Sequence, residues 1–324
     1  MILYRWQGAA RNFGDELNRL LWPRLLPHFF DANPEVQFLG IGSILDARHS
    51  PSQLKLVAGS GYGGYERPSR LDNSWLIHWV RGPHTAALYG LPPNLALGDP
   101  ATLVPFVVLP RAAAPGRVGF MPHFESAAHG CWQEATAAAG LRIIDPRGDP
   151  SAIVAEIAGC ELIVSEALHG VIVADALRTP WIAVRPLAPI HRAKWQDWAA
   201  ALSLEIRFHP LPASSLLEQA HASLLIRNHT GRKLLIEHAD RLRPLWAKRF
   251  VSRATSALLR LKSQAPQLSS EQALDRSQTR MLERLEAVRS SAYSGAFQPA
   301  GGNPGGGIRG SGLRHVINPA YHIS

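Results

Sequence analysis

Short apolar segments alternate with amphipathic segments along the first third of the chain. Apolar runs at 1–5, 36–41, 54–58 and 75–80 each end in a polar or glycine-containing stretch. This is typical of strands whose carboxyl ends line a site. After Asn12, leucines recur at helical spacing. The pattern therefore predicts alternating strands and helices.

A second alternating series begins near residue 117. Its apolar runs lie at 117–121, 141–144, 161–164 and 181–184. Between the two series, 105–116 is rich in proline and alanine and predicts an interdomain linker. We expect an α/β fold in which two Rossmann-like, doubly wound domains, 1–110 and 111–240, face each other across a cleft.

Beyond Pro244 the pattern becomes purely helical, and the charge changes with it. Residues 1–240 contain 21 Lys or Arg and 21 Asp or Glu, whereas 241–324 contain 13 and 4 and carry the whole net charge of +9. We expect a basic helical extension over 241–295. The glycine-rich end, 296–324, has the composition of a disordered tail.

The extension also has an amphipathic stretch at 244–263. Basic residues are interspersed among apolar ones that recur near helical spacing: Leu245, Trp246, Phe250, Leu258 and Leu261. Such a helix can lie in an anionic membrane interface. It can equally pack across the two domains with its basic residues in solvent, or divide the tasks, with its first half packed and the rest meeting lipid.

Composition narrows the class of protein. The chain is 46% hydrophobic and 18% charged, an ordinary globular balance, and Cys131 and Cys160 are its only cysteines. We find neither a signal peptide nor an apolar run of the ~20 residues that would span a bilayer. We therefore expect a cytoplasmic protein, soluble or peripheral. The neutral body argues against a nucleic-acid enzyme.

The most informative segment is ELIVSEALHGVIVADALRTPWIAV, residues 161–184. It predicts a buried strand running into a helix whose first turn holds Leu168, His169 and Gly170. Unpaired N–H groups at a helix start favour phosphate or carboxylate, and glycine allows close approach of a ligand. The alternative is a capping histidine without chemistry, and spacing alone leaves the two interpretations equal.

Three other residues stand at the ends of predicted strands. Arg81 follows the run at 75–80, where its planar guanidinium could hold a carboxylate or phosphate, or simply cover the surface. Asn12 and Asp15 flank the first helix start, where they suit a cap and a first-turn acid. Asp15 is also a candidate base for an acceptor hydroxyl.

Two further patterns suggest known kinds of site. Gly59, Gly61 and Gly64 fit G-x-G-x-x-G, but no helix-like segment follows, so we reject a dinucleotide site and expect Gly61 and Tyr62 to approach a ligand. We therefore expect the protein to use no cofactor.

His123, Glu125 and His129 invite a metal hypothesis, but their spacing does not match a metalloprotease helix. We therefore expect no metal, and a loop in which His123 and Glu125 contact substrate. Lys194 could reach a phosphate, or it could be a surface lysine.

The segment at 161–184 resembles the signature of the polysaccharide pyruvyl transferases, and further motifs of that family follow its order over roughly residues 1–200. They are NFGDELN (12–18), GIGSIL (40–45), GSGYGG (59–64), VRGPHTAALYGLP (80–92), LGDPATL (97–103), GFMPHFES (119–126), DPRGDP (145–150) and KWQDWA (194–199). The exopolysaccharide branch, of the xanthan and succinoglycan type, is the most similar.

The resemblance implies a two-domain fold like that of GT-B glycosyltransferases and phosphoenolpyruvate as donor. The family's best-supported functional histidine matches His169. Some relatives carry arginine two positions earlier, where this chain has Ala167, so Arg81 becomes the leading replacement. The donor site implied comprises Arg81, Ser165, Glu166, Leu168, Gly170 and Lys194, with His169 as the catalytic residue.

The function implied is transfer of pyruvate, as a ketal, to sugar hydroxyls of a lipid-linked exopolysaccharide repeat unit. The helix at 244–263 would hold such an enzyme at the inner face of the cytoplasmic membrane. Two alternatives stay open at this point: a GT-B glycosyltransferase that uses a nucleotide sugar, and a non-catalytic membrane- or nucleic-acid-binding protein.

Overall fold

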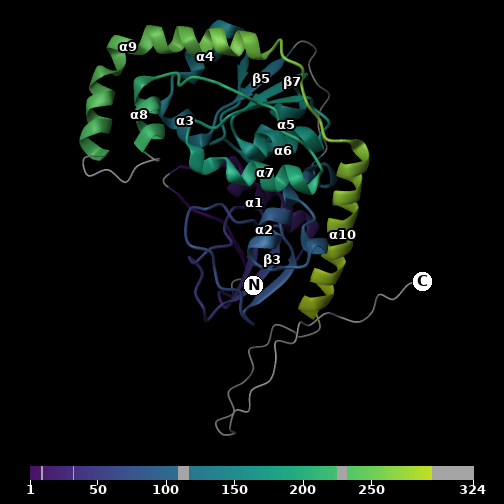
Figure 1. Cartoon of the computed structure of the whole chain (residues 1–324). Helices are drawn as coiled ribbons and strands as arrows, with labels where there is room; N and C mark the ends of the chain where they lie inside the picture. Colours follow the sequence, from purple (N-terminus) through teal and green to yellow (C-terminus); the bar gives the residue numbers. More distant parts are fainter. Residues whose placement is uncertain (9, 32, 109–116, 225–231, 294–324) are drawn as a thin grey trace.

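A computed structural model describes residues 1–8, 10–31, 33–108, 117–224 and 232–293 (Figure 1). Most of the predicted linker and the whole predicted tail at 296–324 lie outside these residues. The described chain contains two separate parallel sheets with helices around them, so the predicted α/β class is confirmed. The domain boundaries and the GT-B-like arrangement stay predictions.

The first sheet is built from strands in chain order, β1-β2-β3-β4, all parallel. Its strands are β1 (Ile2–Tyr4), β2 (Val36–Leu39), β3 (Leu54–Ala58) and β4 (Trp75–Trp79). Helices α1 (Phe13–Leu25) and α2 (Pro83–Leu88) and the 3₁₀ helices η1 (Pro93–Leu95) and η2 (Pro100–Phe106) complete this half. The apolar runs predicted from the sequence therefore lie within a few residues of the strands.

The second sheet has the order β6-β5-β7-β8-β9, again parallel. Its strands are β5 (Val118–Met121), β6 (Arg142–Ile143), β7 (Leu162–Ser165), β8 (Trp181–Val184) and β9 (Phe208–His209). Its helices are α3 (Phe124–His129), α4 (Trp132–Ala139), α5 (Pro150–Ala158), α6 (Leu168–Ala176), η3 (Pro189–His191), α7 (Ala193–Ala201) and α8 (Leu216–Leu224). The strand order reverses between β5 and β7, and open α/β sheets bind ligands beside such a reversal.

Local signals explain several boundaries in this half. Asp149 caps α5 by accepting a hydrogen bond from the Ala152 N–H at 3.0 Å, and Pro150 occupies the first helical position. Helix α4 ends at Gly140, whose φ of 67° is left-handed and suits glycine. These caps fix where the chain turns back toward the sheet.

The two halves meet through helices that share one apolar core. Phe13 and Leu17 of α1 are buried in the same cluster as Ile153 of α5 and Leu168 of α6. Burying a side chain of this size stabilises the fold by about 1.5–3 kcal/mol. The relative position of the halves is therefore held by packing as well as by the chain connection.

The last two helices pack against different halves of the protein. Helix α9 (Arg232–Leu261) lies over the second half, whereas α10 (Glu271–Tyr293) returns along the first half (Figure 1). Ser277 of α10 donates a hydrogen bond to the Leu97 carbonyl, at 2.6 Å, and Gln278 donates one to the Thr102 carbonyl, at 2.7 Å. Helices α9 and α10 are thus part of the fold. None of the described helices is long and apolar enough to cross a membrane.

The sequence left open that the first half of 244–263 packs against the protein while the second half meets lipid. The structure shows the opposite order. Leu258 and Leu261 are buried in the core of the second half, together with Ala254 and Ala257. Leu245 and Trp246, near the middle of α9, are instead 78% and 42% exposed. Most of the later part of this stretch packs, although Leu259 is 44% exposed, and the adjacent exposed pair Leu245 and Trp246 lies in the earlier part.

Candidate functional site

His169 lies at the junction of the two halves, on the first turn of α6 and directly beyond β7. Its Nε2 lies 3.4 Å from Oδ2 of Asp99, at the start of η2 in the other half. Both atoms are buried, and neither has a hydrogen-bond partner among the described residues. The other oxygen of Asp99 accepts from the Ala101 N–H at 3.0 Å. The histidine and the carboxylate therefore face each other without a complete hydrogen bond.

The first turn of α1 contacts the other side of the His169 ring. A methyl group added at Gly14 would overlap Nδ1 of His169, so only glycine leaves room for the ring here. Sequence reasoning missed both Gly14 and Asp99. Both residues stand inside quoted motifs, NFGDELN and LGDPATL, and this was the available signal.

Two carboxylates of the first half act electrostatically on His169. Burial raises the pKa of Asp15, and the nearby His169 and the Asn12 amide offset this only in part. For Asp99, burial would raise the pKa, but the nearby His169 and the Ala101 N–H lower it below the usual value. Asp99 therefore remains ionised at neutral pH, whereas Asp15 is the more basic carboxylate.

Asn12 supports Asp15 rather than capping the helix. It occupies the N-cap position of α1, but its side chain makes no cap hydrogen bond. Its amide instead donates to Oδ2 of Asp15 at 2.7 Å. The structure therefore brings together three predicted site residues, Asn12, Asp15 and His169.

Arg81 forms a second junction between the halves. Its side chain is 1% exposed, and its Nε donates to Oδ2 of Asp197 on α7 at 3.1 Å. Its terminal nitrogens donate to Ser43 Oγ and to the Tyr62 carbonyl, each at 2.7 Å. Asp197 also accepts hydrogen bonds from the Thr85 N–H and hydroxyl. The surface interpretation of Arg81 is therefore wrong, and its role in donor binding stays a prediction.

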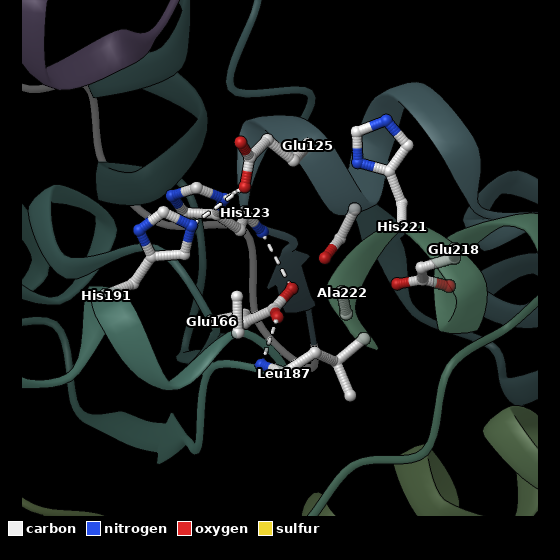
Figure 2. Close-up of a pocket in the computed structure, with 10 residues that line it drawn as sticks. His123, Glu125, Glu166, Leu187, His191, Glu218, His221 and Ala222 are labelled. Carbon is white, nitrogen blue, oxygen red and sulfur yellow. Dashed lines mark hydrogen bonds and ion pairs between the residues drawn. The ribbon is translucent and has the colours of Figure 1, made fainter. Parts of the chain in front are cut away.

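A third cluster lies where β5, β7 and β8 end, and it lines a small open pocket (Figure 2). Glu166, directly after β7, accepts from the His123 N–H at 2.9 Å and from the Leu187 N–H at 3.1 Å. Oε2 of Glu125 lies 2.8 Å from Nε2 of His191 and accepts a hydrogen bond from it when that nitrogen carries the proton. Glu166 thus ties two loops together, and Glu125 pairs with a histidine that sequence reasoning had not considered.

The family model for polysaccharide pyruvyl transferase matches residues 59–186 of this chain. This interval includes Arg81, Asp99, His123, Glu125 and His169. The chain is also 36% identical over 315 residues to the "Succinoglycan biosynthesis protein ExoV" of Rhizobium meliloti (strain 1021), an alignment that covers 90% of this chain and 99% of that protein. The chain belongs to the polysaccharide pyruvyl transferase family. The resemblance stated from its motifs is confirmed, and family membership makes the protein a transferase.

Other predicted donor residues of this pyruvyl transferase have structural partners. Ser165 is fully buried, and its hydroxyl lies 2.9 Å from the Ala167 carbonyl. Leu168 belongs to the core, and a methyl group at Gly170 would collide with Ser165 and Met121. Close packing beneath α6 therefore accounts for this glycine without a ligand.

The other predicted contact residues include Lys194, which lies near Tyr65, and Gly61, which lies near Arg81. The Lys194 ammonium lies 5.8 Å from the centre of the Tyr65 ring. The Tyr65 hydroxyl lies 3.0 Å from Nδ1 of His191, so this loop of the first half touches the third cluster. In the neighbouring loop, Gly61 packs closely over the Arg81 guanidinium. The roles predicted for Lys194, Gly61 and Tyr62 stay predictions.

Proposed function

We propose that this protein transfers pyruvate from phosphoenolpyruvate to two hydroxyls of a sugar in an exopolysaccharide repeat unit, forming a ketal and releasing phosphate. Family membership supports pyruvyl transfer, and the name of the relative from Rhizobium meliloti supports an exopolysaccharide as acceptor. The observation that carries the proposal is the position of His169, between a helix start and two carboxylates of the opposite half.

The reaction begins with protonation of the methylene carbon of the enol phosphate. In this proposal, protonated His169 donates that proton, and positive charge develops at the neighbouring carbon. Nε2 is buried against Asp99, and the side chain is 14% exposed, so part of the ring can reach a donor. Asp99 faces the ring and would hold its orientation, as a carboxylate partner does for a catalytic histidine.

The acceptor hydroxyl then adds to the charged carbon and loses its proton. Asp15 is placed to receive that proton, because burial raises the pKa of its carboxyl and makes the carboxylate more basic. Phosphate leaves, a second hydroxyl of the same sugar closes the ring, and its proton leaves with the phosphate or through Asp15. The first turn of α6 would bind the phosphate or carboxylate, since no side chain caps this helix start.

The proposal includes a lipid-linked acceptor and a peripheral position on the inner face of the cytoplasmic membrane. Leu245 and Trp246 are exposed on α9, with the basic residues Lys248 and Arg249 nearby. An apolar patch among cations suits an anionic bilayer surface. Flotation with anionic vesicles tests this part: the double variant Leu245→Glu/Trp246→Glu should remain with the soluble fraction. Leu88→Glu, at a comparably exposed leucine on α2, is the control and should float like the wild type.

The transfer reaction is tested by incubating the full chain with phosphoenolpyruvate and lipid-linked oligosaccharides from exopolysaccharide pathways. The proposal predicts phosphate release that depends on the acceptor, together with a new ketal methyl signal in the product. Transfer from a nucleotide sugar, with no reaction of phosphoenolpyruvate, would instead support a glycosyltransferase.

A further inference from the structure

Three potential metal ligands converge in the third cluster. His123 and Glu125 lie around the start of α3, and His191 closes η3, beyond β8. One ligand atom from each lies within 4.8 Å of the others. Nδ1 of His123 lies 3.5 Å from Oε2 of Glu125, and Nε2 of His191 lies 2.8 Å from the same oxygen. Figure 2 shows the two imidazole rings side by side beneath the Glu125 carboxylate.

The chemistry of these groups suits a cation. Two histidines and one carboxylate form a common set of protein ligands for zinc that leaves further coordination positions open. A metal ion binds imidazole nitrogens and carboxylate oxygens only in their deprotonated forms, so binding to these three ligands should weaken as the pH falls.

The surroundings hold these ligands in place. Nδ1 of His191 lies 3.0 Å from the Tyr65 hydroxyl, so it can donate there and leave Nε2 free to bind a metal. Glu166 accepts from the backbone N–H of His123 and holds that residue's loop. His191 is only 8% exposed, whereas Glu125 is 26% exposed and lies at the open pocket. Contacts with Tyr65 and Glu166 thus hold the ligands in place, and Glu125 can be reached from the pocket.

We propose that His123, Glu125 and His191 bind one divalent transition-metal cation, of the class of Zn²⁺ or Co²⁺, with its open positions toward the pocket. This inference is independent of the proposed function, since the pyruvyl transfer derived above uses no metal. The sequence analysis considered His123, Glu125 and His129 as metal ligands and expected no metal. The proposed site differs from that set in one ligand. His129, the third residue considered there, stacks instead on His221, with ring centres 3.9 Å apart, and His191 takes its place.

The test is a titration of the full chain with Co²⁺ after dialysis against a chelator, followed by visible absorption and by competition with Zn²⁺. We expect saturation at one equivalent and a spectrum of four- or five-coordinate cobalt. Glu125→Gln and His191→Asn each remove a ligand. They should weaken binding by more than the roughly 10- to 100-fold that follows the loss of a ligand's supporting hydrogen bond.

Two further variants keep the test specific. Tyr65→Phe removes only the partner of His191 and should weaken Co²⁺ binding by about tenfold. His129→Gln lies beside the same pocket and should bind like the wild type. Thermal unfolding of each variant checks that the fold persists. The proposal is overturned if the wild type shows no saturable binding of Co²⁺. His123, Glu125 and His191 would then form a hydrogen-bonded cluster without a metal. The proposal is also overturned if Glu125→Gln binds as tightly as the wild type, or if His129→Gln abolishes binding.

Discussion

The two halves of the protein meet at two charged junctions that are built in opposite ways. At the first, every nitrogen of the Arg81 guanidinium has a partner, and both oxygens of Asp197 accept hydrogen bonds. At the second, His169 and Asp99 face each other at 3.4 Å, each with a buried polar atom that lacks a partner among the described residues. Both junctions join a helix of the second half to the first half.

The difference indicates what each junction is for. Buried polar groups are normally paired, because leaving one unpaired costs about 1–3 kcal/mol. Arg81 uses one N–H of each guanidinium nitrogen to bind residues of both halves, an arrangement that holds the halves in register. An incompletely paired histidine and carboxylate retain hydrogen-bonding capacity, as a site that pairs with substrate requires. We therefore propose that the Arg81–Asp197 contact is a scaffold and that His169 and Asp99 carry the chemistry.

The variant His169→Ala should show the largest effect. Loss of an acid–base group typically lowers turnover by about 10²–10⁴-fold. The fold should persist, because this side chain is 14% exposed and its Nε2 has no hydrogen-bond partner among the described residues. Acceptor-dependent phosphate release and the thermal midpoint, measured on one preparation, check both statements. Turnover close to that of the wild type would remove His169 from the chemistry.

Arg81→Lys should affect stability more than donor binding. Lysine keeps the charge but loses the planar fork, so at least one charged hydrogen bond, worth about 1.5–3 kcal/mol, is broken. Urea unfolding should report this loss, while the Michaelis constant for phosphoenolpyruvate stays near the wild-type value. A clearly raised Michaelis constant in a stable variant would support the prediction that Arg81 binds the donor.

Asp99→Asn should lower turnover by about tenfold or more, with little change in the Michaelis constant, because a neutral amide presents no opposite charge to the His169 ring in the transition state. It should also change acid stability. The pKa of Asp99 is lowered in the folded protein, so its contribution to stability is present above the unfolded pKa and is lost as the pH falls through the folded pKa. Unfolding followed below pH 4 should therefore depend less on pH in the variant. An identical acid profile would contradict the lowered pKa.

Asp15→Asn should show the smallest effect and the opposite sign in stability. The pKa of Asp15 is raised by burial, so its ionised form destabilises the fold as the pH rises through the folded value. The amide should raise the free energy of unfolding at pH 7 by up to about 1 kcal/mol and lower turnover. Lower stability at pH 7, with the Asn12 contact preserved, would mean that the carboxylate is well paired.

The sequence predicted those features that local patterns determine. Strand-to-helix passages such as 161–176 follow from apolar runs and boundary residues, and His169 was placed correctly at the start of α6. The face of α9 was not predictable in this way. A helix with apolar and basic residues looks the same whether its apolar side meets lipid or protein, and only the packed structure shows Leu258 in the core.

Contacts between distant residues were beyond local patterns. Glu125 and His191 are 66 positions apart, and Asp99 and His169 belong to opposite halves. Neither pairing leaves a periodicity or a spacing in the chain. Motif order did mark LGDPATL as a shared segment, but only the three-dimensional contact shows that its aspartate faces the histidine.

The most direct test of the central claim is a crystal structure of the protein with phosphoenolpyruvate bound. The account predicts density for the phosphate or carboxylate at the first turn of α6, with the methylene carbon facing the His169 ring and the Arg81–Asp197 contact unchanged. Density for the donor against Arg81, released from Asp197, or in the pocket beside His123 and His191 with His169 untouched, would contradict it.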